Sequence, residues 1–510
     1  MQGKRKFIQP DELPEFEYIF DDLDGPAVPQ PAPLEEIIPS IVLLGVPFDH
    51  LTMKTALEEI EKMIASREPH YLVTANVDFL VQSLRDLELR RILLEAHRVL
   101  CDGTPLLWAS KLLGNALPER VAGSDLVPLL LERAEEKGYR IFFLGGEAEV
   151  AERAVQEAAA KYPRLIIAGH YSPPFQPLLE MDHDDICRRV RQAAPDILLV
   201  SFGCPKAEKW MSMHYRRLGV PVAIGVGGTI DFLAGRVKRA PAWMQRSGLE
   251  WVYRLLQEPR RLYRRYVDDL WFFGRAIAGQ YLHCRPAEKP GDDSPGEVVL
   301  SEPTWQRIRA PGWFDAATLA RNSEMWREAQ RHHCVLELSG VQHIDSTGIG
   351  LLLALEKRLT ARGSHLVLMD PSPTVRKVLK CLRLEHHFLT ASDIFTAREL
   401  LDRNGHVPAS IQPENGFHAT LPLIWSGEIT AANEPEYWRR IEQEIRSWAE
   451  ITDIIPADLA ELRFIDSTGI GVLLRARKLA QKLGVTLQLR GAIGPVLDIL
   501  RVSRMDWLLD

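Results

Sequence analysis

Between Ile41 and Gly228 the sequence alternates short apolar runs with stretches of helical periodicity, and this alternation restricts the fold more than any other feature. The runs read IVLLGVPF, YLVTANV, RVLCDG, IFFLGG, LIIAGHY, ILLVSFG and VAIGVGG, and most of them end in a turn residue. Such runs are typical of strands in a parallel sheet that helices cover on both faces. Helical periodicity fills intervals such as 52–66, 78–96 and 147–161. We therefore predict an α/β domain built on a mostly parallel sheet.

A repeated motif marks the C-terminal part of the chain. His343–Leu353 reads HIDSTGIGLLL and Phe464–Leu474 reads FIDSTGIGVLL, and the two aspartates lie 121 residues apart. In each copy an apolar strand precedes the motif (Cys334–Leu338; Asp458–Leu462), and a helix and a further strand follow it. Two copies of one small α/β domain explain this pattern most simply.

These patterns, together with shifts in composition, divide the chain into successive stretches. The first stretch carries nine acidic residues and a Pro-rich piece, which favour an unpacked tail. The predicted stretches are a disordered tail (1–37), the α/β core (38–234), a basic aromatic helical appendage (235–285), a linker (286–298), the first small domain (299–404), a second linker (405–415) and the second small domain (416–510).

Composition excludes several classes of protein. The net charge of −7 disfavours a globally basic nucleic-acid binder, and we expect no nucleic-acid partner. Six cysteines without a CxxC pair indicate neither a disulfide framework nor a zinc ribbon. We find neither a signal-peptide core near the first residue nor an apolar run of about 18 residues, so the expected location is cytoplasmic.

Polar side chains follow two consecutive apolar runs. Thr74 and Asn76 come at the end of one run, and Asp102 follows the next. Parallel strands end at the same edge of a sheet, where ligands of such folds bind. A carboxylate there can accept a proton from an attacking hydroxyl group. The alternative is that Asp102 caps the helix that follows it.

Two glycine pairs and one charged segment add candidate binding residues. Gly145, Gly146 and Gly227 lie at strand ends, where backbone amides can approach a phosphate closely. The segment GCPKAEKW offers Lys206 and Glu208 after a third strand. Lys206 either meets a diphosphate or is an ordinary solvated lysine. The glycines match neither the P-loop nor the dinucleotide-binding fingerprint.

Metal binding has weak support in the sequence. Asp22 with Asp24, and Asp182 with Asp184, have the spacing that can hold a divalent cation with a nucleotide sugar. The first pair lies in the acidic tail and the second at the start of a predicted helix. We expect no metal and no other cofactor.

The appendage combines basic and aromatic residues. Gly235–Arg285 contains eleven basic and four acidic residues, interleaved with tryptophan, tyrosine and phenylalanine. Arg and Lys gain up to about 1 kcal/mol each near an anionic membrane, and Trp and Tyr prefer its interface. The alternative is a helical hairpin that packs on the core with solvated arginines outside. The arginines expected at an anionic membrane surface are Arg254, Arg260, Arg261, Arg264 and Arg265.

Residues 41–285 resemble the WecG/TagA/CpsF glycosyltransferases, bacterial enzymes that add a sugar to a lipid-linked carrier. The matching pieces are TANVDFL, CDGTPLLW, ERVAGSDL, FFLGGE, SFGCPKAEKW and GVGGTIDFLAGRVKRAPAWMQRSGLEWVYRLLQEPRRLYRRY. The resemblance implies a Rossmann-like fold and inverting, metal-independent transfer from a UDP-sugar, typically UDP-N-acetylmannosamine. The implied acceptor is linked to a polyprenyl diphosphate, in the assembly of surface polysaccharide on the inner face of the membrane.

The resemblance also implies roles for single residues. Asp102 matches the general base, Thr74 and Asn76 match groups that position the acceptor or the donor, and Arg120 matches an arginine on the diphosphate side. Gly227 and Asp231 fall in the longest matching piece and are expected to bind substrate.

One position departs from the family pattern. The family reads G-x-P-x-Q-E, and Ala207 stands here in place of the glutamine. This difference puts the donor identity and full activity in question. It keeps an alternative open: a regulatory scaffold that senses a UDP-sugar without transferring it.

Residues 299–404 and 416–510 resemble STAS domains of the anti-sigma-factor-antagonist type. The resemblance implies that Ser346 and Ser467, in the two DSTG motifs, are phosphorylated by a partner kinase and that this modification releases the partner. An added charge of roughly −2 is enough to break an interface. In the plainer alternative the motif only caps a helix, through Asp345 or Ser346 and through Asp466 or Ser467.

Overall fold

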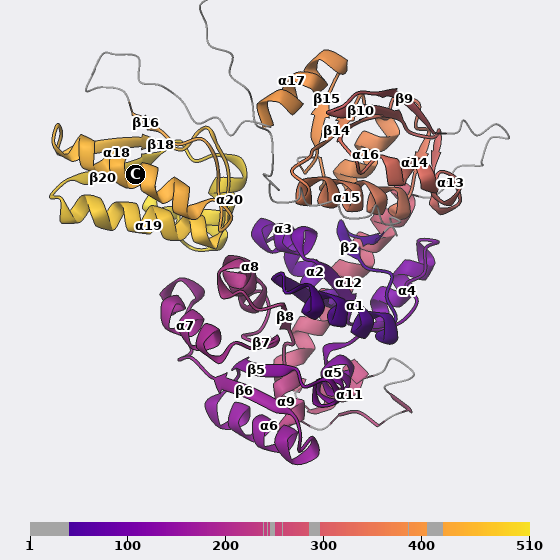
Figure 1. Cartoon of the computed structure of the whole chain (residues 1–510), viewed down its shortest axis with the longest axis vertical. Coiled ribbons are helices and arrows are strands. Elements are labelled where there is room, and N and C mark those ends of the chain that lie inside the picture. Colours follow the sequence, from indigo (N-terminus) through magenta and orange to yellow (C-terminus); the bar gives the residue numbers. More distant parts are fainter. Residues whose placement is uncertain are drawn as a thin grey trace, which may run out of the picture. The chain divides into compact units, whose positions relative to one another are not determined.

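A computed structural model describes residues 40–237, 239–241, 243–244, 250–257, 259–284, 296–385, 387–404 and 422–509, without the side chains of residues 261, 262, 265 and 402–404. The predicted tail and the predicted linker 405–415 lie outside these residues. The described residues form one large α/β domain and two small ones (Figure 1).

The large domain is built on the parallel sheet that the apolar runs predict. Its six strands follow the order β4-β3-β8-β7-β5-β6, and every neighbouring pair is parallel. The predicted fold class is therefore confirmed. The strands are β3 (His70–Ala75), β4 (Arg98–Cys101), β5 (Arg140–Gly145), β6 (Ile166–Tyr171), β7 (Ile197–Ser201) and β8 (Val222–Gly225).

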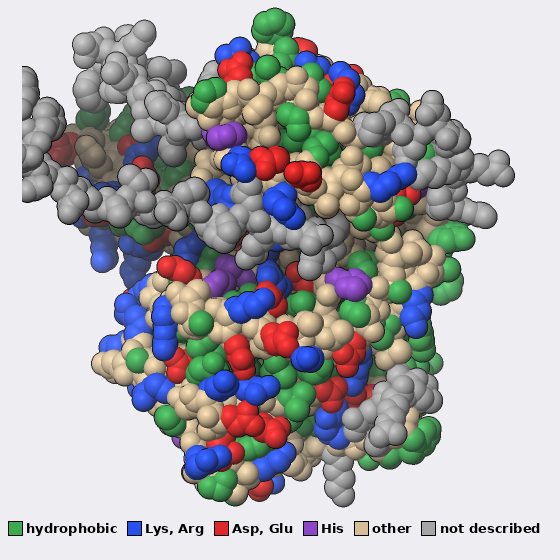
Figure 2. Space-filling model, turned by 45° about the vertical axis from the view of Figure 1, so that its right-hand side comes forward, with side chains coloured by type: hydrophobic (Ala, Val, Ile, Leu, Met, Phe, Trp, Pro, Cys, Tyr) green, Lys and Arg blue, Asp and Glu red, His purple; other side chains and the backbone are tan. Residues whose placement is uncertain are grey.

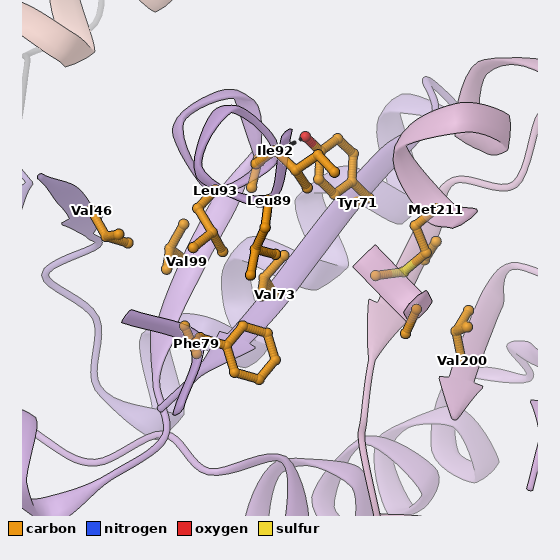
Figure 3. Packing of buried hydrophobic residues seen from close by; sticks show 14 of the residues in the cluster. Val46, Tyr71, Val73, Phe79, Leu89, Ile92, Leu93, Val99, Val200 and Met211 are labelled. Atoms are coloured by element: carbon orange, nitrogen blue, oxygen red, sulfur yellow. Dashed lines mark hydrogen bonds between the residues drawn. The ribbon is translucent and has the colours of Figure 1, made fainter. Parts of the chain in front are cut away.

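Helices cover both faces of this sheet because the strand side chains alternate in direction. Tyr71 and Val73 pack in one buried cluster, whereas Leu72 between them packs in the cluster on the opposite face. Figure 3 shows the first cluster, where Tyr71 also donates a hydrogen bond of 2.9 Å to the carbonyl of Ile92. One face carries α1 (Met53–Ser66), α5 (Gly123–Lys137), α6 (Ala148–Lys161) and α9 (Thr229–Leu233); the other carries α2 (Val77–Ser83), α3 (Leu87–Glu95), α4 (Thr104–Leu112), α7 (His183–Ala193) and α8 (Lys206–Leu218).

Two sequence predictions within this domain are wrong. The run IVLLGVPF is an antiparallel hairpin of β1 (Ile41–Leu43) and β2 (Val46–Phe48), because Leu44 and Gly45 adopt positive φ angles of 52° and 82°. The interval 78–96 holds two helices rather than one. The side chain of Asp86 caps α3 by accepting a hydrogen bond from the Leu89 amide at 3.0 Å, so a new helix begins there.

The appendage consists of α11 (Glu250–Gln257) and the long helix α12 (Pro259–Cys284). Helix α12 packs against α2, and Gln280 bonds to the Leu44 amide and the Val42 carbonyl, each at 2.8 Å. The appendage is therefore joined to the core, as the helical alternative expects. Its outer face still presents Tyr263 and Trp271, which are 60% and 71% exposed. Among the described helices none is long and apolar enough to span a membrane.

The first small domain has a five-stranded sheet in the order β15-β14-β12-β10-β9 and a separate pair, β11 with β13. Strand β9 (Glu297–Ser301) begins inside the predicted linker 286–298, so that linker ends earlier than predicted. The other elements are β10 (Trp305–Arg309), β11 (Trp313–Phe314), α13 (Ala316–Arg321), α14 (Ser323–Glu328), β12 (His333–Glu337), β13 (His343–Ile344), α15 (Ser346–Ala361), β14 (Leu366–Met369), α16 (Pro373–Cys381), β15 (Leu389–Ala391) and α17 (Ile394–Asn404).

The second small domain repeats this plan with fewer strands. The predicted strand 458–462 is wrong: the Asp458 carboxylate accepts a hydrogen bond of 2.8 Å from the Ala460 amide and turns the chain between two strands. The elements are β16 (Leu423–Ile424), β17 (Gly427–Ile429), α18 (Glu434–Ala449), β18 (Ile454–Asp458), β19 (Leu462–Ile465), α19 (Ser467–Lys482), β20 (Thr486–Arg490) and α20 (Gly494–Val502).

Acidic and basic side chains are interspersed on the described part of the surface in Figure 2. No single sign of charge dominates the described residues of that face, in keeping with the small net charge of −7.

Candidate functional site

A pocket of about 210 Å³ opens at the carboxyl edge of the large sheet. The loops after β3, β4 and β8 supply one side of it, and helices α11 and α12 supply the other. Parallel α/β sheets bind their ligands at this edge. On the core side the lining residues include Thr74 near the end of β3, Asn76, Asp102, Gly227 and Gly228 after the strands, and Arg120 from the segment between α4 and α5. Those from the appendage include Glu250, Trp251, Arg254, Tyr266 and Asp269.

Asp102 is held at the end of β4 by its backbone. Its amide donates to the carbonyl of Ala75 at 2.9 Å, which ties the ends of two neighbouring strands together. Its carboxylate accepts a hydrogen bond from the Gly123 amide at the start of α5. Helix α4 is capped at Gly103 and has no side-chain cap, so the alternative in which Asp102 is the N-cap is wrong.

The surroundings of Asp102 make its carboxylate more basic than usual. Burial raises its pKa to about 6, while Arg120, the Gly123 amide and Arg254 lower it and Glu250 raises it. Such a carboxyl group is ionised at neutral pH and still binds a proton more readily than an ordinary aspartate. This combination suits a general base.

Thr74 and Asn76 line the pocket and also make internal hydrogen bonds. The Thr74 hydroxyl donates to the carbonyl of Gly225 at 2.9 Å, linking β3 to β8. The Asn76 carbonyl oxygen caps α2 by accepting from the amides of Asp78 and Phe79, at 3.0 and 3.4 Å. Because the cap uses only the oxygen, the Asn76 amide nitrogen can still donate toward a ligand.

Arg120 lies in a network of two arginines and two carboxylates. It donates to Asp125 at 2.5 Å and to Glu250 at 2.9 Å. Arg239 bonds Asp125 at 2.6 Å and lies 3.7 Å from Glu250. The network joins the appendage to the core at the rim of the pocket.

Arg254 is a second cation in the pocket, although the sequence prediction placed it at a membrane surface. Its guanidinium lies 5.2 Å from the centre of the Phe232 ring and close to Gly228, where an added Cβ would be 3.6 Å from one of its nitrogens. Two guanidinium groups therefore line one pocket, a donor set well suited to a diphosphate.

Other predicted residues lie near this edge of the sheet but are not among the described lining residues. Gly145 ends β5 and Gly146 follows it, with φ angles of +98° and +78°, and an added Cβ at Gly145 would meet the Ser201 carbonyl at 2.6 Å. Asp231 lies beside Gly228, 3.7 Å from Arg236. Gly227, with φ of +51°, does line the pocket.

The segment before and inside α8 is also set back from the pocket. Lys206 donates to the carbonyl of Gln176 at 2.5 Å and lies 5.4 Å from the ring of Phe175. Glu208 is only 2% exposed. Neither side chain is among the described residues that line the pocket.

The acidic pairs have other roles or lie outside the description. Asp182 caps α7 by accepting from the Asp185 amide at 2.9 Å, and Asp184 pairs with Arg217. Asp22 and Asp24 fall outside the described residues. The described chain contains no group of three or more His, Cys, Asp or Glu side chains that could hold a metal ion.

The remaining predicted arginines belong to α12. Arg260 and Arg264 are exposed there, and the side chains of Arg261 and Arg265 are not among those that the structure describes.

The two DSTG motifs have matching geometry. Asp345 caps α15 by accepting from the amides of Thr347 and Gly348, at 2.8 and 3.0 Å. Asp466 caps α19 by accepting from the Gly469 amide at 2.8 Å. Of the alternatives for the cap, the aspartates are the N-cap residues, and Ser346 and Ser467 are the first residues of the helices.

The family resemblance implies that the appendage helps close the active site, but sequence reasoning did not identify which of its residues line the pocket. Tyr266, Asp269 and Leu270 all line the pocket, and their i, i+3, i+4 spacing places them on one face of α12. That spacing was visible in the sequence, but the structure was needed to show which face meets the core. Trp251, whose ring centre lies 6.1 Å from that of Tyr266, was missed for the same reason.

Family models match three regions of the chain. The model of the glycosyl transferase WecG/TagA/CpsF family matches residues 41–285. The STAS domain model matches residues 313–398, and a model described as "Mlab, STAS domain" matches residues 421–510.

Named relatives match the large domain. Proteins of Staphylococcus aureus strains MW2 and NCTC 8325, both named N-acetylglucosaminyldiphosphoundecaprenol N-acetyl-beta-D-mannosaminyltransferase, are 30% identical over 224 residues, which is 44% of this chain and 86% of theirs. A solved structure of the anti-sigma factor antagonist SpoIIAA, in its unphosphorylated form, is 23% identical over 21% of this chain and 94% of its own, with a TM-score of 0.19. The chain therefore belongs to the WecG/TagA/CpsF glycosyltransferase family, and two STAS domains follow its transferase domain.

Proposed function

We propose that the large domain transfers a sugar from a UDP-sugar to an acceptor linked to a polyprenyl diphosphate, with inversion at the anomeric carbon and without a metal. The observation that carries this proposal is Asp102, whose pKa is raised to about 6 in a pocket that Arg120 and Arg254 also line. The Asp102 carboxylate and two guanidinium groups in one pocket are suitable for removing a proton while a diphosphate leaves.

In the proposed reaction, Asp102 accepts the proton of the acceptor hydroxyl as its oxygen forms a bond to the anomeric carbon. The bond between that carbon and the diphosphate oxygen breaks, and its electron pair leaves with UDP. A single displacement of this kind inverts the anomeric configuration. Arg120 and Arg254 stabilise the negative charge that develops on the leaving diphosphate.

The names of the relatives guide the choice of substrates. Those proteins are named for transfer of N-acetylmannosamine to N-acetylglucosaminyldiphosphoundecaprenol. By analogy we propose that the donor for this chain is UDP-N-acetylmannosamine or a related UDP-hexose. The acceptor is a lipid-linked sugar, and the reaction serves the assembly of surface polysaccharide.

An acceptor of this kind is a membrane lipid, so the enzyme must reach the inner face of the membrane. Helix α12 supports this part of the proposal. Its exposed residues include Arg260, Arg264, Tyr263 and Trp271, which combine positive charge with aromatic rings. This composition favours peripheral contact with anionic lipids.

For the STAS domains we propose a regulatory or docking role. Ser346 and Ser467 open α15 and α19, where the positive end of the helix dipole interacts favourably with a phosphate. A kinase that phosphorylates either serine would change the charge of that surface and release or recruit a protein partner.

A second function stays open because of Ala207. Its side chain is 1% exposed and carries no polar group in place of the glutamine expected there. A chain that lacks this amide and binds a UDP-sugar without transferring it would act as a sensor.

The experiment is calorimetric titration of the full chain with UDP and a panel of UDP-sugars, in the presence of a chelator, followed by transfer assays with a short-chain lipid acceptor. We expect UDP to bind and Asp102→Asn to keep that binding while the turnover falls by about 10²–10⁴-fold. Asp184→Asn, a change on the exposed end of α7, is the matched control and should behave as wild type. Binding without any transfer by the wild type supports the sensor, and no UDP binding overturns both functions.

A further inference from the structure

Glu208 is a buried acid that the proposed reaction does not use. It lies in the first turn of α8, and its side chain is 2% exposed. One of its carboxyl oxygens, Oε2, is buried without a hydrogen-bond partner. The other, Oε1, packs so closely on Gly225 that a Cβ added there would lie 2.8 Å away.

Among the described residues, the one charged group that acts on the Glu208 carboxyl group is an acid, so no cation compensates its charge. The Cys204 thiol and the backbone amide of Glu208 donate hydrogen bonds to the carboxyl group, and the charged group that acts on it is Asp78, of the same sign. The apolar side chain of Met211, also on α8, packs on Gly225 as well: a Cβ added to that glycine would lie 3.1 Å from it. An ionised carboxylate in these surroundings has lost its contact with water and gains no cation in exchange, so its burial costs free energy.

Protonation removes this cost. Burial, and to a smaller extent the charge of Asp78, raise the pKa of Glu208 to about 8, although the hydrogen bonds from its own amide and from Cys204 lower it in part. At neutral pH the side chain is therefore mostly the uncharged acid, with one oxygen available as a donor.

The backbone that Glu208 contacts leads directly into the pocket. The carbonyl oxygen of Gly225 accepts a hydrogen bond of 2.9 Å from the Thr74 hydroxyl. The residues that follow it, Val226–Thr229, line the pocket. Two further hydrogen bonds hold this turn. The Val226 amide donates to the carbonyl of Val200 at 3.0 Å, and the Ser201 hydroxyl donates to the carbonyl of Gly227 at 2.5 Å.

We propose that Glu208 is a positioning residue which, as an uncharged carboxylic acid, supports Gly225 and so fixes the Val226–Thr229 turn that forms one wall of the pocket. It contacts no substrate. Its effect on a ligand rests on the proposed function, whereas its protonation and its effect on the turn do not.

The first test therefore needs no substrate. Infrared difference spectra of the full chain, wild type minus Glu208→Gln, should show the C=O band of a protonated carboxylic acid at pH 7, and this band should disappear as the pH rises through about 8. Glu149→Gln, an exposed change on α6, is the control and should give no such band. A carboxylate signal at pH 7 would overturn the proposal.

Hydrogen exchange tests the supporting role. Glu208→Gln keeps the shape of the side chain and has no charge, so the amides of residues 226–229 should keep the protection they have in the wild type. Glu208→Ala leaves a void, and these amides should exchange faster. Equal exchange in the two variants would show that the turn does not depend on Glu208.

UDP binding then links the residue to the ligand. If only the uncharged form holds the turn correctly, the wild-type affinity should fall about fivefold between pH 8 and pH 9, because the uncharged fraction of Glu208 falls by that factor. The Glu208→Gln affinity should stay nearly constant over this range. The same fall in both proteins would assign the pH dependence to another group. If the wild type does not bind UDP at all, the proposed function fails, while the infrared and exchange results still decide the role of Glu208.

Discussion

The guanidinium of Arg120 donates to the carboxylate of Glu250 at 2.9 Å. This hydrogen bond pairs a core residue, in the segment between α4 and α5, with the first residue of α11. Both side chains line the pocket, and the arginine is 18% exposed. A diphosphate that approaches Arg120 must therefore share it with Glu250 or displace that carboxylate. In the proposed function, Glu250 of the appendage therefore competes with the diphosphate for Arg120.

This competition predicts the effect of Glu250→Gln. The variant keeps a hydrogen-bonding side chain but removes one negative charge from the pocket, so UDP should bind several-fold more tightly. Arg120→Ala should weaken UDP binding by about 10–100-fold, the usual value of a hydrogen bond to a charged group. Calorimetric titration measures both. Glu136→Gln, on the exposed side of α5, serves as the control. Weaker binding by Glu250→Gln would mean that the ion pair holds the site together more than it competes.

The pKa of Asp102 predicts a pH dependence. The general base must be ionised, and burial raises its pKa to about 6. The rate of transfer should therefore rise with pH up to about 6 and level off near pH 7. Asp102→Asn should lose this acidic limb together with most of the activity. The measurement is kcat/KM as a function of pH with a short-chain acceptor. A wild-type profile that stays flat between pH 5 and pH 7 would contradict the assignment.

Two glycines provide matched tests of packing. Gly225→Ala places a Cβ 2.8 Å from Glu208 and 3.1 Å from Met211, and such overpacking should cost about 1–3 kcal/mol of the free energy of unfolding. Gly274 lies in the middle of α12 with no atom within 4 Å of an added Cβ. Gly274→Ala should therefore stabilise the helix by about 0.5–1 kcal/mol. Denaturant unfolding of both variants measures the difference, and equal effects would contradict the tight contact at Gly225.

The sequence was sufficient to predict the parallel sheet and the edge at which the pocket lies. Apolar runs indicate buried strands. The polar residues at their ends, Thr74, Asn76 and Asp102, lie at one edge of the sheet because the carboxyl ends of parallel strands lie at the same edge. Boundaries that depend on one local contact were not predictable in this way. The hairpin at Leu44–Gly45 and the helix start at Asp86 are set by backbone angles and a cap that periodicity does not reveal.

The particular appendage residues that line the pocket could not be predicted for a different reason. The charge of Arg254 fits a membrane surface and a diphosphate equally well, and the choice depends on how α11 docks on the core. Glu208 illustrates the same limit. Its motif indicated a ligand-binding acid, but its 2% exposure depends on α8 packing against β8, a contact between distant parts of the sequence.

Membrane contact can be tested on the exposed side of α12. The double variant Arg260→Glu/Arg264→Glu reverses two exposed charges outside the described pocket lining, so cosedimentation with vesicles that contain anionic lipid should fall strongly. Its UDP affinity should stay unchanged, because neither residue is among the described residues that line the pocket. The control is Arg164→Glu/Arg188→Glu, which reverses two exposed charges elsewhere on the same domain. Binding that is insensitive to the α12 charges, to salt and to anionic lipid would assign the exposed aromatic face of α12 to a protein partner instead.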